Sequence, residues 1–362
     1  MRLQAGRLQQ TIASCIEKTG TALHTGKTTT VKIWPEFAGA GRYFDFNSNS
    51  IRASIDFATK VSPLCTTLCK DGRSVRTVEH LLSALEATGV DNCRIEIDCS
   101  DDDEDDCCAE VPIFDGSARE WVEAIEQVGL TVTTDRSGNN CEQLAPFLNE
   151  PVHVWMNDSF IAAFPSPEVH ISYGIDFRLV PAIGCQWFSS IPLNDSFYAK
   201  EIAPSRTFCI YEEVEQMRKA GLIKGGSAEN AIVCSATRGW LNPPLNFPDE
   251  PCRHKVLDLI GDLALFARSG SQGLPVAHIV VYKVQTPKDL ETGGGGVVVA
   301  VAGCYGGFRL CGTGWGDGVD RGGVAFDIGG FTMAVYSCCG DRDEWRLWCC
   351  DGMMGWTGGV EP

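Results

Sequence analysis

The chain has 362 residues, of which 44% are hydrophobic and 21% charged, and its formal net charge at pH 7 is −17. This length suggests about two domains and is ample for a sizeable core. A strongly acidic chain does not attract nucleic acid or anionic lipid, so we expect no nucleic-acid partner, and an anionic substrate would need local Lys or Arg. No apolar run reaches the ~18 residues of a membrane-spanning helix, so we expect no transmembrane segment.

The cysteine content first suggests disulfides, because there are 18 Cys. They are scattered, however, and nothing points to export, so we expect reduced thiols. Adjacent pairs such as Cys107-Cys108 lack zinc-ribbon spacing and do not predict a structural zinc. The segment 1–11 has two Arg and no acid. It is too short and too polar for a secretory signal and fits the stub of an organelle transit peptide.

Residues 9–60 predict β structure. Residues 28–34 are β-branched and alternating, and glycines punctuate residues 9–60. His24 lies in Thr-Ala-Leu-His-Thr-Gly at an expected turn, where a hydrogen-bonded turn histidine is favoured over a metal ligand.

Residues 77–86 predict a helix with Thr77 as its N-cap. Its apolar positions follow the i, i+3, i+4, i+7 pattern of an amphipathic helix: Val78, Leu81, Leu82 and Leu85. Glu79 and His80 lie off this stripe. They are either solvated surface residues, or His80 is a metal ligand and Glu79 a base beside the metal, as in zinc hydrolases.

The rest of the first half predicts a strand at 92–98 and a strand into a turn at 110–117, followed by a helix at 118–128. Between the strands, residues 101–106 are all acidic, which predicts a loop tip without the spacing of a calcium loop.

Residues 131–150 are polar and rich in turn formers, so we place the domain boundary there, with a first domain at 1–135 and a second at 136–283. The second half again has strands followed by helices, which predicts an α+β fold. We expect strands at 153–164, 169–177, 231–233 and 276–283, a tight turn at 225–227, and a helix at 212–220 that ends at Gly221.

Residues 253–262 contain the highest concentration of side chains that could bind a metal or take part in catalysis. Read as a helix, one face is apolar: Cys252, Val256, Leu259, Ile260 and Leu263. His254 and Asp258 are four residues apart and are therefore neighbours on the surface turned away from that face. They form a surface ion pair, or they hold a metal together with a ligand from elsewhere in the chain.

Residues 284–362 differ from the rest of the chain. They contain 20 of the 39 Gly, four of the nine Trp and a single Lys. No helical period or strand alternation persists, and the segment is too rich in Trp and Cys for a linker. We interpret it as an aberrant Gly/Cys/Trp-rich tail.

Five motifs occur in an order and at intervals typical of one family. They are Thr-Val-Glu-His-Leu at 77–81, Glu-Val-Pro-Ile-Phe-Asp-Gly-Ser at 110–117, Ser-Arg-Thr-Phe at 205–208, Leu-Ile-Lys-Gly-Gly-Ser at 222–227 and Arg-His-Lys-Val-Leu-Asp at 253–258. Together they resemble the UDP-3-O-acyl-N-acetylglucosamine deacetylases, the zinc amidases of lipid A biosynthesis. The resemblance covers roughly residues 9–283. The amino-acid sequences of residues 63–68 and 181–188 resemble those of the plant form.

The resemblance implies two similar domains, each a β-sheet packed on a pair of helices, with the active site between them. It implies Zn²⁺ held by His80, His254 and Asp258, with water in the open fourth position. It also implies Glu79 as general base and Thr207 as a group that stabilises the tetrahedral oxyanion.

The implied substrate is a UDP-linked, acylated N-acetylglucosamine. The resemblance places five residues beside it: Lys255, Phe208, Leu222, Gly226 and Ser227. Lys255 would lie near the sugar or diphosphate, and Leu222 with residues 225–227 would line a passage for the acyl chain. Taken alone, each of these positions is more simply explained by packing or turn geometry.

The sequence departs from the family after residue 283. The family continues with a glycine-histidine segment and a helix, and that histidine is a proton donor or a positive charge at the oxyanion. No histidine follows His278 here, so Asp262, which supports the histidine in the family, lacks its partner. Losing a general acid typically costs ~10²–10⁴-fold in rate.

We hypothesise that residues 284–362 are translated intron, or arise from another gene-model error, and are not folded as in the family. The change of composition is abrupt and begins at Val284, whose codons start with the GT of a splice donor. Sequencing the transcript tests this, and a mature message that encodes the tail would contradict it.

The expected function is zinc-dependent hydrolysis of the N-acetyl group, with release of acetate, by a monomer in mitochondria or, alternatively, in the cytoplasm. The competing function is an impaired or inactive chain that binds zinc and a nucleotide sugar. A zinc peptidase is disfavoured, because His-Glu-x-x-His places both histidines on one helix, whereas His80 and His254 are far apart in the sequence.

Overall fold

The computed structural model describes residues 2–46, 49–59, 64–99, 107–156, 158–190, 192–283, 323–328, 331–336 and 347–349. The expected acidic loop tip at 101–106 lies outside the described residues, as does most of the tail. Among the described helices, none has the length and apolar character needed to cross a bilayer.

Two five-stranded sheets with the same strand order form the framework. The first has the order β3 (Ile16–Thr21), β4 (Thr28–Pro35), β10 (Cys93–Cys99), β5 (Arg42–Phe46) and β6 (Asn49–Arg52). The second has the order β14 (Val152–Met156), β15 (Ser159–Pro165), β21 (Ala277–Tyr282), β16 (His170–Phe177) and β17 (Gly184–Ser189). In each sheet the central strand is the last in sequence; it runs antiparallel to one hairpin and parallel to the other. The fold is therefore α+β with two similar domains, as expected.

Each domain carries additional small sheets. The first adds β7 (Ala58–Thr59), β8 (Thr67–Lys70), β9 (Arg73–Arg76) and β11 (Cys108–Glu110), and the second adds β18 (Phe208–Ile210), β19 (Ile232–Ser235) and β20 (Gly239–Trp240). Two further pairs are β1 (Arg2–Leu8) with β13 (Glu142–Phe147), and β2 (Gln10–Ile12) with β12 (Leu130–Val132). In the tail, β22 (Gly323–Ile328), β23 (Phe331–Tyr336) and β24 (Leu347–Cys349) form an antiparallel sheet. The domain limits and the nature of the tail stay predictions.

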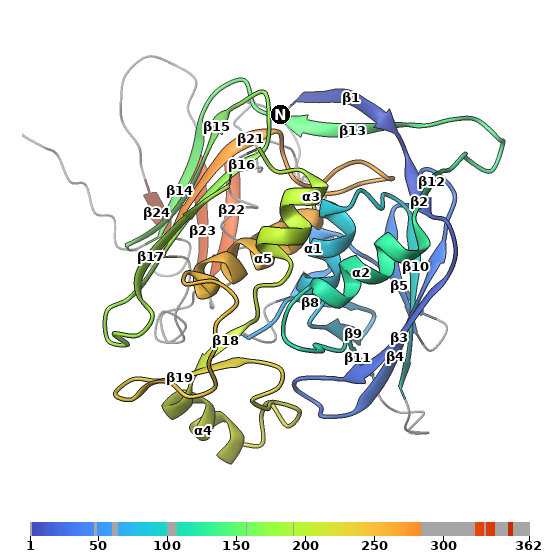
Figure 1. The fold of residues 1–362 in the computed structure, drawn as a ribbon. Coiled ribbons are helices and arrows are strands. Elements are labelled where there is room, and N and C mark those ends of the chain that lie inside the picture. Colours follow the sequence, from blue (N-terminus) through green and yellow to red (C-terminus); the bar gives the residue numbers. More distant parts are fainter. Residues whose placement is uncertain are drawn as a thin grey trace, which may run out of the picture.

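The main helices lie between the two large sheets (Figure 1). They are α1 (Glu79–Ala87) and α2 (Arg119–Val128) of the first domain, and α5 (Glu250–Ala264), α3 (Asp195–Phe197) and the π-helical segment η2 (Tyr198–Ile202) of the second. The short helix η1 (Ile55–Phe57) precedes β7, and α4 (Tyr211–Lys219) packs on β18 and β19. This sandwich gives α1 two covered faces, so all of its residues except the last are buried.

Most expected elements are confirmed, including the helix that ends near Gly221, whose φ is +77°. Three expectations are wrong. The strand expected from residue 110 onward is β11 (Cys108–Glu110), which ends at the residue where it was expected to begin. Residues 153–164 form the hairpin β14–β15 instead of one strand. The N-cap of α1 is Val78; Thr77 has φ of +58°, and its hydroxyl donates to Glu110 Oε1 at 3.1 Å. Every cysteine whose side chain the structure describes is a free thiol, as expected.

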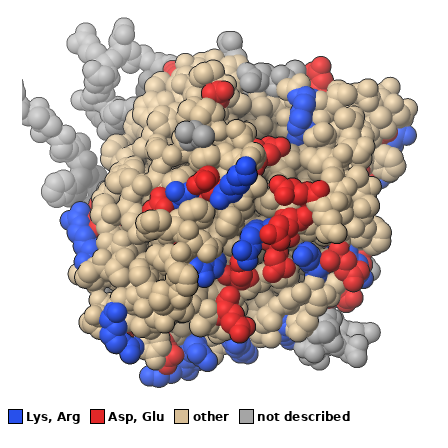
Figure 2. All heavy atoms as spheres, in the orientation of Figure 1, with Lys and Arg blue, Asp and Glu red and all other residues tan. Residues whose placement is uncertain are grey.

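Charges of both signs are mixed on the surface. On the face drawn in Figure 2, Lys and Arg side chains lie beside Asp and Glu side chains despite the net charge of −17. On this face, a positive charge for an anionic substrate would therefore come from individual residues and not from a basic surface.

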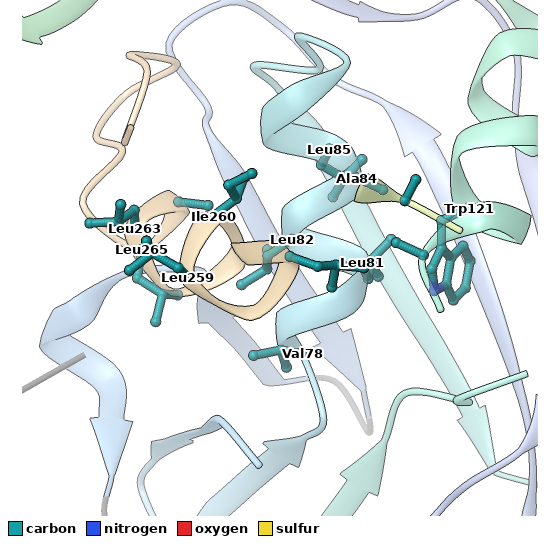
Figure 3. Packing of buried hydrophobic residues seen from close by; sticks show 14 of the residues in the cluster. Val78, Leu81, Leu82, Ala84, Leu85, Trp121, Leu259, Ile260, Leu263 and Leu265 are labelled. Atoms are coloured by element: carbon teal, nitrogen blue, oxygen red, sulfur yellow. The ribbon is translucent and has the colours of Figure 1, made fainter. Parts of the chain in front are cut away.

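Helices α1 and α5 pack directly against each other, and their apolar side chains form the centre of the core. Figure 3 shows Leu82 of α1 toward Leu259 and Ile260 of α5, and Leu81 on the side of Trp121. All four aliphatic side chains are fully buried. This contact joins the two domains and fixes where their polar side chains meet.

Gly261 makes the close approach of the two helices feasible. A Cβ at this position would lie 2.1 Å from the carbonyl oxygen of Glu79 and 3.0 Å from its Cα. Glycine in a helix interior normally costs ~0.5–1 kcal/mol relative to alanine. Here the missing side chain lets the backbone of α5 touch α1 beside the two residues that the sequence marks for chemistry, Glu79 and His80.

Gly261→Ala is therefore expected to lower the free energy of unfolding, by ~1–3 kcal/mol, although Gly→Ala in a helix usually raises it. The added methyl group must push α5 away from the backbone at Glu79. Urea unfolding of the two proteins measures the difference. A variant as stable as the wild type, or more stable, would show that the contact is not tight.

Candidate metal centre

The crossing of α1 and α5 brings three potential ligands together. His80 and His254 expose only 4% and 1% of their surface, so the interpretation of these residues as solvated surface groups is wrong. Together with Asp258 they form the one cluster of three or more potential metal ligands among the described residues, and their ligand atoms lie within 4.8 Å of one another.

The separations between the ligand atoms fit a small tetrahedral cation. Asp258 Oδ1 lies 3.5 Å from His80 Nε2 and 3.4 Å from His254 Nε2. Zinc bonds to nitrogen and oxygen of ~2.0–2.2 Å, at tetrahedral angles, place neighbouring ligand atoms ~3.3–3.5 Å apart. Asp258 Oδ1 is also buried and has no hydrogen-bond partner among the described residues. A buried carboxylate oxygen without a partner is costly unless a cation or donor meets it, so the residues fit zinc.

The protonation states also suit metal binding. Burial lowers the pKa of His254 to about 4, so the ring is neutral at neutral pH. Its Nδ1 lies 2.9 Å from the carbonyl oxygen of Ser205. Since a carbonyl only accepts, Nδ1 carries the hydrogen, and Nε2 presents its lone pair to the centre. Burial opposes ionisation of Asp258, but the neighbouring His254, Lys255 and His80 outweigh it and hold the pKa below its ordinary value.

Glu79, expected as a general base, directly precedes His80 at the start of α1. It is 8% exposed, and its Oε2 accepts a hydrogen bond from the backbone N–H of Thr66 at 3.1 Å. Burial, with the nearby Cys65 and Asp258, raises the pKa of its carboxyl group well above the ordinary value. A carboxylate that binds a proton more tightly than usual is suited to general-base work near neutral pH.

Asp262 contacts Thr66 as well. The Thr66 hydroxyl donates to Asp262 Oδ1 at 2.6 Å, and burial raises the pKa of Asp262 to about 7. Thr66 therefore links the two carboxyl groups. No sequence pattern marks this threonine, because its role depends on a loop that meets α5 from the other domain.

Asp262→Asn is expected to change the pH dependence of stability in the metal-free protein. The folded-state pKa of about 7 lies above the unfolded value of ~3.9. The folded state therefore holds this proton more tightly, and stability falls as pH rises from ~4 to ~7. Asparagine does not titrate, so the free energy of unfolding of the variant relative to the wild type should increase over that window by up to ~4 kcal/mol. Urea unfolding of chelator-treated proteins at several pH values tests this, and a constant difference would contradict it.

Three of the other expected site residues are Thr207, Phe208 and Lys255, the last of which belongs to α5. Thr207 is held by two backbone bonds, from its own N–H to Gly116 O at 2.7 Å and from Ile232 N–H to its carbonyl at 2.8 Å. Lys255 donates to Asp258 Oδ2 at 2.8 Å, and its ammonium lies 5.6 Å from the ring centroid of Phe208. These contacts place a cation and an aromatic ring beside the centre.

The expected acyl-passage residues lie in the loop after α4. Leu222 is 50% exposed, and Gly226 and Ser227 follow it in a turn. This loop packs on the turn that holds His24, because Lys224 N–H donates to His24 O at 3.2 Å. His24 lies in a turn, as expected, and its backbone N–H donates to Glu110 Oε1 at 2.8 Å. Its ring Nε2, however, is buried without a hydrogen-bond partner among the described residues.

Comparison with known proteins agrees with the motifs. The family model described as UDP-3-O-acyl N-acetylglycosamine deacetylase matches residues 9–285. The chain belongs to this deacetylase family. It is 62% identical over 279 residues to a protein of Arabidopsis thaliana named "Probable UDP-3-O-acyl-N-acetylglucosamine deacetylase 1, mitochondrial". The match covers 77% of this chain and 85% of the relative.

Cyanobacterial relatives match over the same part of the chain. UDP-3-O-acyl-N-acetylglucosamine deacetylase of Trichormus variabilis is 48% identical over 281 residues, covering 76% of this chain and 93% of the relative. The protein of the same name from a Nostoc species is 46% identical over 282 residues, with the same coverage. Residues 286–362 lie outside the family match.

Proposed function

We propose that the chain is a zinc-dependent amidohydrolase that removes the N-acetyl group from UDP-3-O-acyl-N-acetylglucosamine and releases acetate, in lipid A biosynthesis. The observation that carries this proposal is the buried cluster His80, His254 and Asp258, whose spacing fits tetrahedral zinc, in a chain of the deacetylase family. A bound zinc ion would supply a Lewis acid that polarises the acetyl carbonyl and acidifies water.

Glu79 carries out the proton transfers in this mechanism. Its carboxylate takes a proton from the attacking water as the new C–O bond forms at the acetyl carbon. When the C–N bond breaks, the leaving nitrogen needs a proton, and the raised pKa of Glu79 lets it hold one for that step. One water is consumed, and acetate and the free amine are the products.

The neighbouring side chains bind and orient the substrate in this proposal. Thr207 stabilises the oxyanion of the tetrahedral intermediate. Lys255 and Phe208 lie near the sugar and diphosphate, and Leu222, Gly226 and Ser227 contact the acyl chain. We also propose a monomer, since one chain supplies all three ligands and the site needs no second copy. The names of the plant relatives support a mitochondrial location.

A second candidate function is an impaired chain that binds zinc and a nucleotide sugar but turns over little. It is favoured by the end of the family match at residue 285 and by the lack of any histidine after His278. In this case Asp262 has no histidine to support.

Acetate release by the purified full-length protein separates the two candidates. The deacetylase should convert UDP-3-O-acyl-N-acetylglucosamine to the free amine, a mass loss detectable by mass spectrometry, and a chelator should stop the reaction. Zinc-loaded protein that binds the nucleotide sugar but releases no acetate would reject the deacetylase and support the impaired chain.

A further inference from the structure

The carboxylate of Glu250, in the first turn of α5, is fully buried. It accepts four hydrogen bonds. Three come from Arg206, by its backbone N–H at 3.0 Å, its Nε at 2.8 Å and its Nη2 at 3.1 Å, and one comes from the backbone N–H of Asn246 at 2.5 Å. Taking a carboxylate out of water is expensive unless such partners compensate for it. This group therefore holds the segment around Arg206 firmly against the start of α5.

That segment reaches the metal centre through its backbone. Ser205, directly before Arg206, is fully buried, and its carbonyl oxygen is the partner of His254 Nδ1 at 2.9 Å. Thr207 follows directly after. His254 is four residues beyond Glu250 on the same helix, so the two side chains share a face. In its first turn, α5 thus holds residues 205–207 through Glu250. One turn later, the same segment provides the Ser205 carbonyl as the hydrogen-bond partner of His254.

We propose that Glu250 is a positioning residue for the metal centre. Its carboxylate fixes residues 205–207 so that the Ser205 carbonyl orients the His254 ring and keeps Nε2 directed at the ion. Partners of this kind fix the tautomer and orientation of a ligating histidine, and their loss typically costs ~10–100-fold in metal affinity. The inference rests on the proposed zinc site, but not on the identity of the substrate.

A general stabilising role for Glu250 is the competing explanation. An acidic side chain in the first turn interacts favourably with the helix dipole and so stabilises the helix. Glu201 offers a matched control. It also pairs with an arginine of α5, with Arg253 Nη1 at 2.7 Å from its carboxylate. Its side chain is 42% exposed, and its contact does not involve the 205–207 segment.

The test measures zinc affinity by competition with a chelator of known strength, without any substrate, for the wild type, Glu250→Gln, Glu250→Asp and Glu201→Gln. Glutamine has the shape of glutamate but cannot accept all the Arg206 bonds, so we expect affinity to fall ~10–100-fold. Aspartate keeps the charge on a shorter stem and should lose less. Glu201→Gln should bind zinc like the wild type.

Urea unfolding of the metal-free proteins shows which variants fold, and Glu250→Asp decides the matter if Glu250→Gln does not fold. Folded Glu250 variants with wild-type zinc affinity would overturn the proposal, as would an equal loss in Glu201→Gln. A wild type that binds zinc but releases no acetate would reject the proposed deacetylase and leave this inference intact.

Discussion

Glu79→Gln is expected to lower the rate of acetate release by ~10²–10⁴-fold while zinc stays bound. The amide keeps the shape of the side chain and still offers an oxygen to the backbone N–H of Thr66, now 3.1 Å from the carboxylate. It cannot take a proton from water. Steady-state kinetics give the rate, and metal analysis of the same sample gives the zinc content.

Glu120→Gln is the matched control, since Glu120 is a half-exposed residue of α2 that pairs with Lys18 at 3.4 Å. It should leave the rate unchanged. A Glu79→Gln enzyme that keeps more than about a tenth of the wild-type rate would remove Glu79 from its role as general base.

His254→Ala is expected to abolish stoichiometric zinc binding and, with it, the reaction. The substitution removes one of three ligands and leaves Asp258 Oδ1, which already lacks a hydrogen-bond partner among the described residues, facing only His80. The affinity loss should exceed the ~100-fold that marks the upper range for groups that merely support a ligand. Metal analysis after gel filtration measures this directly.

His278→Ala provides the comparison, because His278 lies on β21 with its Nε2 3.0 Å from the hydroxyl of Ser172. It belongs to no cluster of potential metal ligands in the part of the chain that the structure describes. It should retain one zinc per chain. Unchanged zinc content in His254→Ala would show that the metal, if bound, is held elsewhere.

The two helices of the site, α1 and α5, could be predicted from the sequence, but the contact between them could not. The apolar spacing around Leu259 and around Leu82 indicates each helix and its core-facing side. Nothing in the spacing says that His80 meets His254, because that contact depends on the crossing of two helices from different domains. The resemblance supplied the connection, and the distances in the structure support it.

The interpretation of Glu79 and His80 as surface residues was wrong for a physical reason. Periodicity identifies the face that a helix turns to its own sheet, and residues off that face are then expected in solvent. Helix α1 lies between two sheets and packs on α5, so its polar side is covered too, and Glu79 and His80 are buried. A two-sided burial of this kind leaves no periodic pattern in the sequence.

The supporting residues were the hardest to foresee. Thr66, Ser205 and Glu250 act through hydrogen bonds to residues distant in the chain. Gly261 could be noticed as a glycine inside an expected helix, which usually signals a packing reason. That reason, the carbonyl of Glu79 at the place of its Cβ, is visible only in the structure.

One zinc ion, held by His80, His254 and Asp258, is proposed to make this chain a deacetylase. The most direct measurement titrates zinc into the metal-free full-length protein while acetate release and bound metal are followed together. The rate should rise with bound zinc and level off at one ion per chain. Acetate release that is independent of bound zinc, or no release at full occupancy, would contradict it.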